Sequence, residues 1–222
     1  IIKDIVRVSS AGNGFILPGL IDSHIHIESS MITPGSFAVA AVSRGTTGVV
    51  ADPHEIANVK GIAGIKYMLD ATENLPIDIY IMLPSCVPAT PFENSGAVLN
   101  AEDLKELIDE KRVLGLGEMM NYPGVINRDK NVLEKILMAK GKIIDGHGPL
   151  ISGRELNAYV AAGVETEHEC SSVDEMKNRL RLGMYIHIRE GSAARNLKEL
   201  IKVVDKDNLR RCIFCTDDKH PK

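Results

Sequence analysis

The stretch GLIDSHIHIESSM, residues 19–31, carries two histidines on what reads as a buried strand that ends in polar residues. His24 and His26 stand two residues apart, so in a strand their side chains point to the same face. Two imidazoles on one face can bind one divalent ion. Taken alone, the stretch leaves two explanations open: an ordinary edge strand with polar side chains, or half of a metal site.

Seven further segments repeat this arrangement of a short β-branched run followed by a polar loop. Together with the first, the strand candidates span residues 16–28, 45–55, 77–90, 112–121, 141–149, 162–170, 183–192 and 211–218. Amphipathic stretches between them begin with helix caps such as Thr33 and Ser172. Asn100 is another cap, and we expect its helix to run over residues 101–112. Strand and helix alternating eight times predict an α/β fold, a (β/α)8 TIM-like barrel.

The composition argues against several classes of function. The net charge is −4 and aromatic residues make up 4% with no Trp, so we expect no phosphate-binding or base-stacking surface. No apolar stretch reaches the ~20 residues of a membrane span, and no signal peptide is visible. Cys212 and Cys215 have redox or zinc spacing, but they lie in an apolar strand and read as structural thiols. We expect a cytoplasmic homo-oligomer that binds a small molecule, no nucleic acid and no membrane.

Ionisable side chains gather where the predicted strands end. In a barrel the carboxyl ends of all strands meet on one face, so these side chains should converge. Histidine together with carboxylate suits Zn, Fe or Mn, and the scarcity of cysteine among them disfavours a closed structural zinc site. An ion with an open coordination position lowers the pKa of water to about 7. The candidate ligands for one or two ions are His24, His26, Glu118, His147, His168 and Asp217.

Each candidate also has a simpler explanation. Glu118 could be a solvated loop acid, and His147, between two glycines, could be a turn residue. His168 could belong to a surface charge cluster, and Asp217 could cap a helix. Because all of them fall at matching strand ends, a shared site is the better interpretation.

Seven segments carry a resemblance to a known family. They are PGLIDSHIHIESSM, GTTGVVADPHEIANV, MLPSCVPAT, GLGEMMNYPGVI, DGHGP, LNAYVAAGVETEHEC and IREGSAARNL. These segments are similar to bacterial and archaeal adenine deaminases of the amidohydrolase superfamily, over nearly the whole chain. The resemblance implies a hydrolase of C–N bonds in cyclic amidines that converts adenine to hypoxanthine and ammonia. It also implies a divalent metal pair, most often Mn or Fe, with Zn possible.

The resemblance implies a role for each ligand. His24 and His26 bind the more buried ion, and Glu118 bridges the two ions. The second ion is bound by His147 and His168. Asp217 binds a metal and moves protons, so Asp217 and Glu118 are the expected catalytic residues. We expect Asp52, Glu55 and Met119 to contact the substrate.

The chain departs from the family at two points. The family usually reads T-D-H-E where this chain has TEHE, so the role of Glu167 is open. Family members carry a β-rich domain built from both chain ends, so residues 1–15 are expected to be a remnant of it or a linker. Residues 16–222 then form a barrel that we expect to be truncated at both ends, without its last helix.

Two rival functions stay open at this stage. One is a different amidohydrolase reaction, on a cyclic amide or another aminopurine, because the same ligands would serve it. The other is a catalytically inactive barrel fragment.

Overall fold

The computed structural model describes residues 6, 14–90 and 92–221, in which strands and helices alternate. Every one of the eight predicted segments contains a strand, and the last contains two short ones. The strands are β1 (Leu20–His26), β2 (Thr46–Ala51), β3 (Asp78–Leu83), β4 (Val113–Met119), β5 (Ile143–Gly146), β6 (Thr166–Glu167), β7 (Tyr185–Arg189), β8 (Cys212–Cys215) and β9 (Asp217–Asp218). Most of the predicted N-terminal remnant, residues 1–15, lies outside the described residues.

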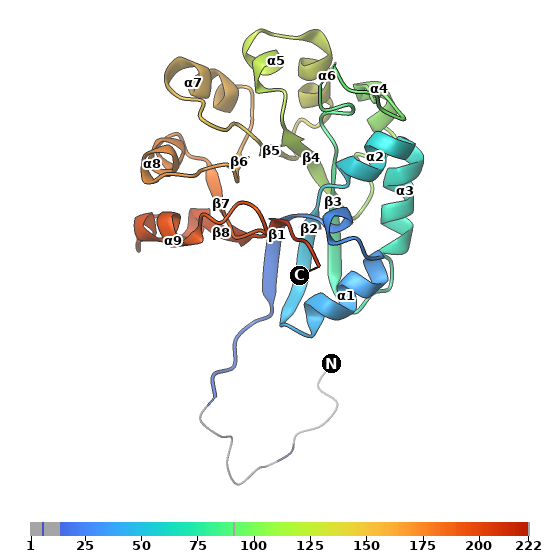
Figure 1. Ribbon diagram of the computed structural model, residues 1–222. Coiled ribbons are helices and arrows are strands. Elements are labelled where there is room, and N and C mark those ends of the chain that lie inside the picture. Colours follow the sequence, from blue (N-terminus) through green and yellow to red (C-terminus); the bar gives the residue numbers. More distant parts are fainter. Residues whose placement is uncertain (1–5, 7–13, 91, 222) are drawn as a thin grey trace.

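The helices surround the strands, which gather at the centre of Figure 1. They are α1 (Pro34–Val42), α2 (His54–Lys60), α3 (Ile62–Ala71), α4 (Ala101–Leu104), α5 (Tyr122–Ile126), α6 (Lys130–Met138), α7 (Gly153–Ala161), α8 (Val173–Arg181) and α9 (Leu197–Leu200). Three 3-10 turns complete the set: η1 (Ile27–Ser30), η2 (Ile201–Val203) and η3 (Leu209–Arg211). Within the described ranges, none of the helices combines the length and apolarity that a membrane crossing requires.

All strand pairs within the two sheets are parallel, which confirms the predicted α/β architecture. One sheet has the order β5-β4-β3-β2-β1-β9, and the other has the order β6-β7-β8. The sheets meet at two places. The N–H of Glu165, just before β6, donates to the carbonyl of Ile144 in β5 (3.0 Å), and the hydroxyl of Ser23 in β1 donates to the carbonyl of Phe214 in β8 (2.9 Å).

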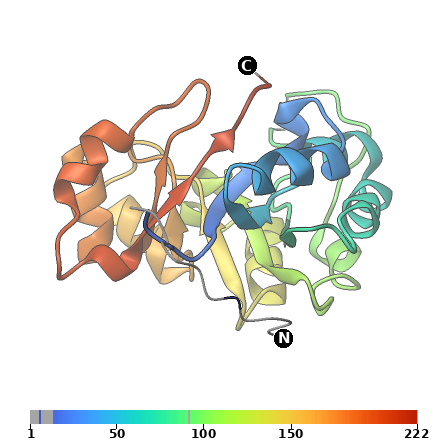
Figure 2. The ribbon, with the colours of Figure 1, turned by 90° about the horizontal axis from the view of Figure 1, so that it is seen from below.

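The apolar core lies between the strands and the helices around them. Figure 2 shows α1 to α3 on one side of the strands and α8 and α9 on the other. Strand residues such as Val49, Ile81 and Leu116 are fully buried, because parallel strands covered by helices bury both faces. Two helix caps are as predicted. Thr33 accepts a hydrogen bond from the third helical N–H, and Ser172 forms a capping box.

The predicted helix over residues 101–112 is wrong in length. Helix α4 ends at Leu104, and the chain continues in tight turns with Leu107 N–H donating to Leu104 and Glu110 N–H donating to Leu107. Leu104, Leu107 and Ile108 are all buried. A spacing of three and four residues therefore buries these side chains in turns as well as in a helix, and the sequence pattern does not distinguish the two.

Candidate active site

The ring nitrogens of the two histidines in β1 face one another in the interior of the molecule. His24 Nε2 and His26 Nε2 are 3.2 Å apart, and both side chains are buried. His24 Nδ1 donates to Asp145 (2.8 Å), and His26 Nδ1 donates to the carbonyl of Asp52 (2.9 Å). With the proton on Nδ1, each Nε2 presents a lone pair. Two lone pairs at this distance repel each other unless a cation lies between them.

Asp217 adds a third possible ligand atom, a carboxylate oxygen, to the two histidine nitrogens. Its Oδ1 lies 3.1 Å from His26 Nε2 and 3.5 Å from His24 Nε2. Ligands at 2.0–2.1 Å from a tetrahedral ion would be about 3.3–3.4 Å apart, so this spacing fits a divalent ion. We call His24, His26 and Asp217 the β1 group.

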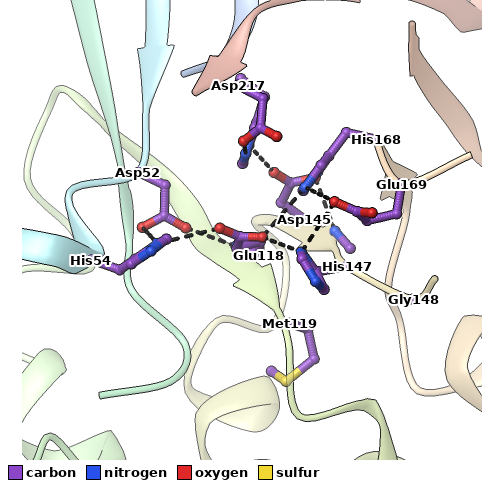
Figure 3. A network of polar contacts seen from close by, with 12 residues as sticks. Asp52, His54, Glu118, Met119, Asp145, His147, Gly148, His168, Glu169 and Asp217 are labelled. Carbon is purple, nitrogen blue, oxygen red and sulfur yellow. Dashed lines mark hydrogen bonds and ion pairs between the residues drawn. The ribbon is translucent and has the colours of Figure 1, made fainter. Parts of the chain in front are cut away.

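Glu118, at the end of β4, lies between two sets of imidazoles (Figure 3). Its Oε1 is 3.2 Å from His26 Nε2 and 3.2 Å from His54 Nδ1. Its Oε2 is 2.5 Å from His147 Nδ1 and 3.3 Å from His168 Nε2. A carboxylate whose two oxygens face different imidazole sets has the geometry of a bridging ligand.

His147 and His168, which follow β5 and β6, form the second set, and we call them the β5–β6 group. The His168 side chain is 1% exposed and stacks on the His24 ring at a centroid distance of 3.9 Å. Nδ1 of His168 has no hydrogen-bond partner among the described residues, and Nε2 faces the carboxylates of Glu118 (3.3 Å) and Glu169 (3.7 Å). A buried polar atom without a partner is costly, so this ring fits the role of a ligand to a second ion.

The charges of the site favour cations at its centre. Burial by itself lowers the pKa of His24, but the Asp145 and Asp217 carboxylates outweigh it and raise that pKa well above its usual value. Burial raises the pKa of Glu118, but four histidine contacts outweigh it and hold that pKa well below the usual value. Seven carboxylates meet one guanidinium, Arg189, in and around the cluster. They belong to Asp52, Glu55, Glu118, Asp145, Glu169, Asp217 and Asp218. Two divalent ions would balance most of this negative charge.

A cavity of about 300 Å³ opens above the cluster. Its lining includes His26, His54, Glu55, Glu118, Met120, His147, Glu169, Arg189, Gly191, Ala193, Ala194, Asp217 and Asp218. Of the expected substrate residues, Glu55 lines this cavity, with Oε2 3.6 Å from His26 Nδ1. The cavity therefore joins the metal-type ligands to a carboxylate that can accept hydrogen bonds.

Asp52 and Met119 lie behind the cavity. Asp52 Oδ2 accepts the N–H of Glu118 (2.9 Å), which needs the glycine at position 117, since a Cβ there would lie 2.1 Å from that oxygen. Met119 is fully buried and points away from the carboxylates, while Met120 lines the cavity (Figure 3). Asp52 thus holds the backbone of Glu118, and Met119 packs in the core.

Three residues that contact the ligands are missing from the predicted site: His54, Asp145 and Arg189. His54, the first residue of α2, faces Glu118. Glu28 accepts the N–H of Ile56 in the same helix (3.4 Å). Asp145 orients His24. Arg189 donates to Asp217 Oδ2 (2.8 Å) and pairs with Glu169. The signals were present, because a histidine after a strand and an acid inside an apolar strand both require polar partners.

The amino-acid sequence of this chain matches that of a known protein family. A model of the amidohydrolase family matches residues 15–219. The chain belongs to the amidohydrolase family. Amidohydrolases generally bind divalent metal, and the histidine and carboxylate clusters around Glu118 could hold such ions.

Three relatives of this amidohydrolase chain are named adenine deaminase. The chain is 63% identical over 211 residues to that of Clostridium acetobutylicum, covering 94% of this chain. It is 58% identical over 209 residues to that of Nitratidesulfovibrio vulgaris (93%) and 53% identical over 218 residues to that of Methanothrix thermoacetophila (97%). The chain spans 37%, 36% and 38% of these relatives.

Proposed function

We propose that this chain is the metal-binding part of an adenine deaminase, which hydrolyses adenine to hypoxanthine and ammonia. One observation carries the proposal. A chain that is 63% identical to an adenine deaminase over 94% of its length also brings four histidines around one buried carboxylate, Glu118, below a cavity.

In this proposal the two sheets form one (β/α)8 barrel. Support comes from the two contacts between the sheets and from the eighth segment. In that segment β8 pairs with β7 and β9 pairs with β1, so one short stretch of chain borders both sheets. We assign residues 16–222 to the barrel and residues 1–15 to a linker or the edge of a β-rich domain.

The residues present fit a pair of ions. The β1 group would hold the first ion, the β5–β6 group would hold the second, and Glu118 would contact both. Mn or Fe suits this mixture of imidazole and carboxylate, and Zn is possible. When bound, the ions would activate water for attack and stabilise the charge that develops on the substrate.

The proton transfers fall to Asp217 in this proposal. Burial raises the pKa of Asp217, but hydrogen bonds with His24 and His26 outweigh it and hold the pKa well below its usual value. The carboxylate is therefore ionised, and in this proposal it accepts the proton of the attacking water. As the C6–O bond forms, Asp217 returns this proton to the ring nitrogen beside C6. A second transfer, from the new C6 hydroxyl to the amino group, makes ammonia the leaving group; the C6–N bond then breaks, and the product keeps a C6 carbonyl and a ring N–H.

Two charged side chains flank this path. Arg189 holds Asp217 Oδ2, which leaves Oδ1 directed at the histidines. Glu55 lines the cavity and accepts hydrogen bonds from donors on the purine edge. Asp52 and Met119 contribute indirectly in this proposal, through the backbone on either side of Glu118.

We also propose a cytoplasmic location, because all four cysteines are free thiols, as is usual in a reducing compartment. The partner in this proposal is the small molecule adenine. A homo-oligomer stays a prediction, which light scattering on the purified protein would check.

The test measures ammonia release with Mn²⁺ added from adenine and, in parallel, from guanine. Ring opening of a hydantoin is followed separately by chromatography, because that reaction releases no ammonia. We expect turnover of adenine alone. Turnover of either other substrate without adenine would point instead to a different amidohydrolase reaction. Bound metal with no turnover of any substrate would favour the inactive barrel.

A further inference from the structure

We infer that Glu167 and Arg179, a buried ion pair beneath the cluster, are positioning residues that set the geometry of His147 and His168. This inference rests on the two-ion centre proposed above. Neither residue lines the cavity, and both are at most 1% exposed. They act through the backbone next to the two histidines.

Glu167 holds two separate ligand segments with one carboxylate. Its Oε1 accepts the N–H of Glu169 (2.8 Å), directly after His168. Its Oε2 accepts the N–H of Gly148 (3.0 Å), directly after His147. The backbone after β5 and the backbone after β6 are therefore fixed to the same side chain.

Arg179, on α8, completes the arrangement from outside the sheet. Its Nε lies 3.4 Å from Glu167 Oε2, and its Nη2 donates to the carbonyl of Gly148. The N–H and the carbonyl of Gly148 are thus both held, one by each member of the ion pair. A Cβ at Gly148 would lie 2.7 Å from Ile151 and 3.1 Å from Glu167 Oε2, so this close approach favours glycine.

The length of the Glu167 side chain matters for this geometry. Aspartate, which stands at this position in the pattern that the sequence resembles, is shorter by one methylene, about 1.5 Å. At the same backbone position a shorter arm would not reach Gly148 and Arg179 as Glu167 does.

Stability alone does not explain the pair. Replacing a buried ion pair by apolar residues of similar volume is often neutral or stabilising, whereas removing one partner is costly. The double replacement Glu167→Met with Arg179→Met therefore separates the two roles. It removes both charges together and keeps the volume, but it cannot hold Gly148.

The experiment titrates the metal-free protein with Mn²⁺ by calorimetry and measures thermal unfolding without metal. We expect two ions for the wild type. In the double variant the affinity for one ion should fall about 10–100-fold, as for other partners that orient ligands, with the other ion unchanged. The reference is His168→Ala, which should lose the same ion. The matched control is Arg112→Met, because Arg112 binds the carbonyl of Ile79 and Thr72 Oγ1 far from the cluster.

The double variant and Arg112→Met should both unfold below the wild-type temperature, because each leaves backbone groups without their hydrogen-bond partners, but Arg112→Met should bind both ions normally. Two ions at wild-type affinity in the double variant would overturn the inference, as would fewer than two ions in the wild type. If the double variant does not fold, Glu167→Asp decides: an unchanged second ion overturns the inference, and a weakened one supports it. The binding readout needs no adenine. A protein that binds two ions but does not deaminate adenine contradicts only the proposed function.

Discussion

The β1 group and the β5–β6 group contribute ligands to one cluster, but the chain positions them in different ways. His24 and His26 lie within a seven-residue strand that pairs with β2 on one side and β9 on the other. His147 and His168 lie just beyond β5 and β6, and β6 has only two residues.

The difference shows that a long strand paired on both sides can position ligands, even though the register between β1 and β2 shifts between Asp22 and Ile25. In the β5–β6 group side chains take over this task. Tyr159, on α7, accepts the N–H of His147 (2.9 Å) and donates to the carbonyl of Met119 (2.8 Å), while Glu167 and Arg179 hold Gly148. We therefore expect the second ion to depend on side chains that hold the backbone of its ligands, and the first ion to depend on the sheet together with the contact between Asp145 and His24.

Glu118→Gln should have the largest effect, because Glu118 serves both groups. The amide keeps the shape but loses the charge and turns an N–H donor toward the imidazoles. Loss of a residue that only orients a ligand lowers metal affinity by up to about 100-fold. Glu118 is itself a ligand, so the affinity for both ions should fall by more than this, and ammonia release should fall to background. A Mn²⁺ titration checks this, with Glu106→Gln in the surface pair with Lys66 as control. Loss of only one ion would argue against the bridging role.

Asp217→Asn comes next and affects the chemistry more than the metal. Asparagine cannot accept the proton of the attacking water, so kcat should fall about 10²–10⁴-fold. Because the β5–β6 group is unaltered, its ion should stay bound. Steady-state kinetics at saturating Mn²⁺ provide the measurement. Near-normal turnover with both ions bound would remove Asp217 from the mechanism.

Asp145→Asn should affect the β1 group alone. It weakens the hydrogen bond that directs His24 Nε2 inward, so the affinity for the first ion should fall about 10–100-fold. The second ion should bind as in the wild type, the reverse of the result expected for Glu167 and Arg179. Equal weakening of both ions would show that the two groups are not independently supported.

The smallest effect should come from Glu175→Gln, at the start of the helix that carries Arg179. Burial raises the pKa of Glu175, but hydrogen bonds from Ser171 and Leu150 outweigh it and lower that pKa from 4.5. A lowered pKa stabilises the fold above about pH 4.5 and loses this contribution as the pH falls through the folded value. Partial exposure and screening limit the gain to about 0.5–1 kcal/mol. Chemical unfolding of the metal-free protein should therefore show a difference at pH 7 that shrinks as the pH falls below 4.5, and a constant difference would contradict the assignment.

Strand positions could be predicted from the sequence because each buried β-branched run ends in polar residues. The spacing of His24 and His26 also fixes which way they point, since side chains alternate along a strand. Asp145 and His54 show where such prediction stops. Asp145 contacts His24, which lies 121 residues away in the sequence. His54, at the start of α2, contacts Glu118 in β4. Only the folded chain brings these atoms together.

Glu167 illustrates a second limit. In the sequence it looks like part of an acidic run around His168, and nothing local reveals that it is fully buried. Its function depends on Arg179 arriving from α8 and on a glycine after β5. Charge patterns near a ligand therefore identify the site, while the contacts that orient it depend on tertiary packing.

Asp217 sits where the last segment changes from one sheet to the other, with a left-handed backbone (φ 57°) after β8 and pairing to β1. Its carboxylate reaches the histidines only when both sheets have docked. A partly assembled molecule would thus hold ligands without its base, and could bind metal without processing substrate. During refolding, ammonia release should begin only after the two sheets have docked, so its onset would report when docking occurs. Metal uptake needs only the other ligands and is expected before that point.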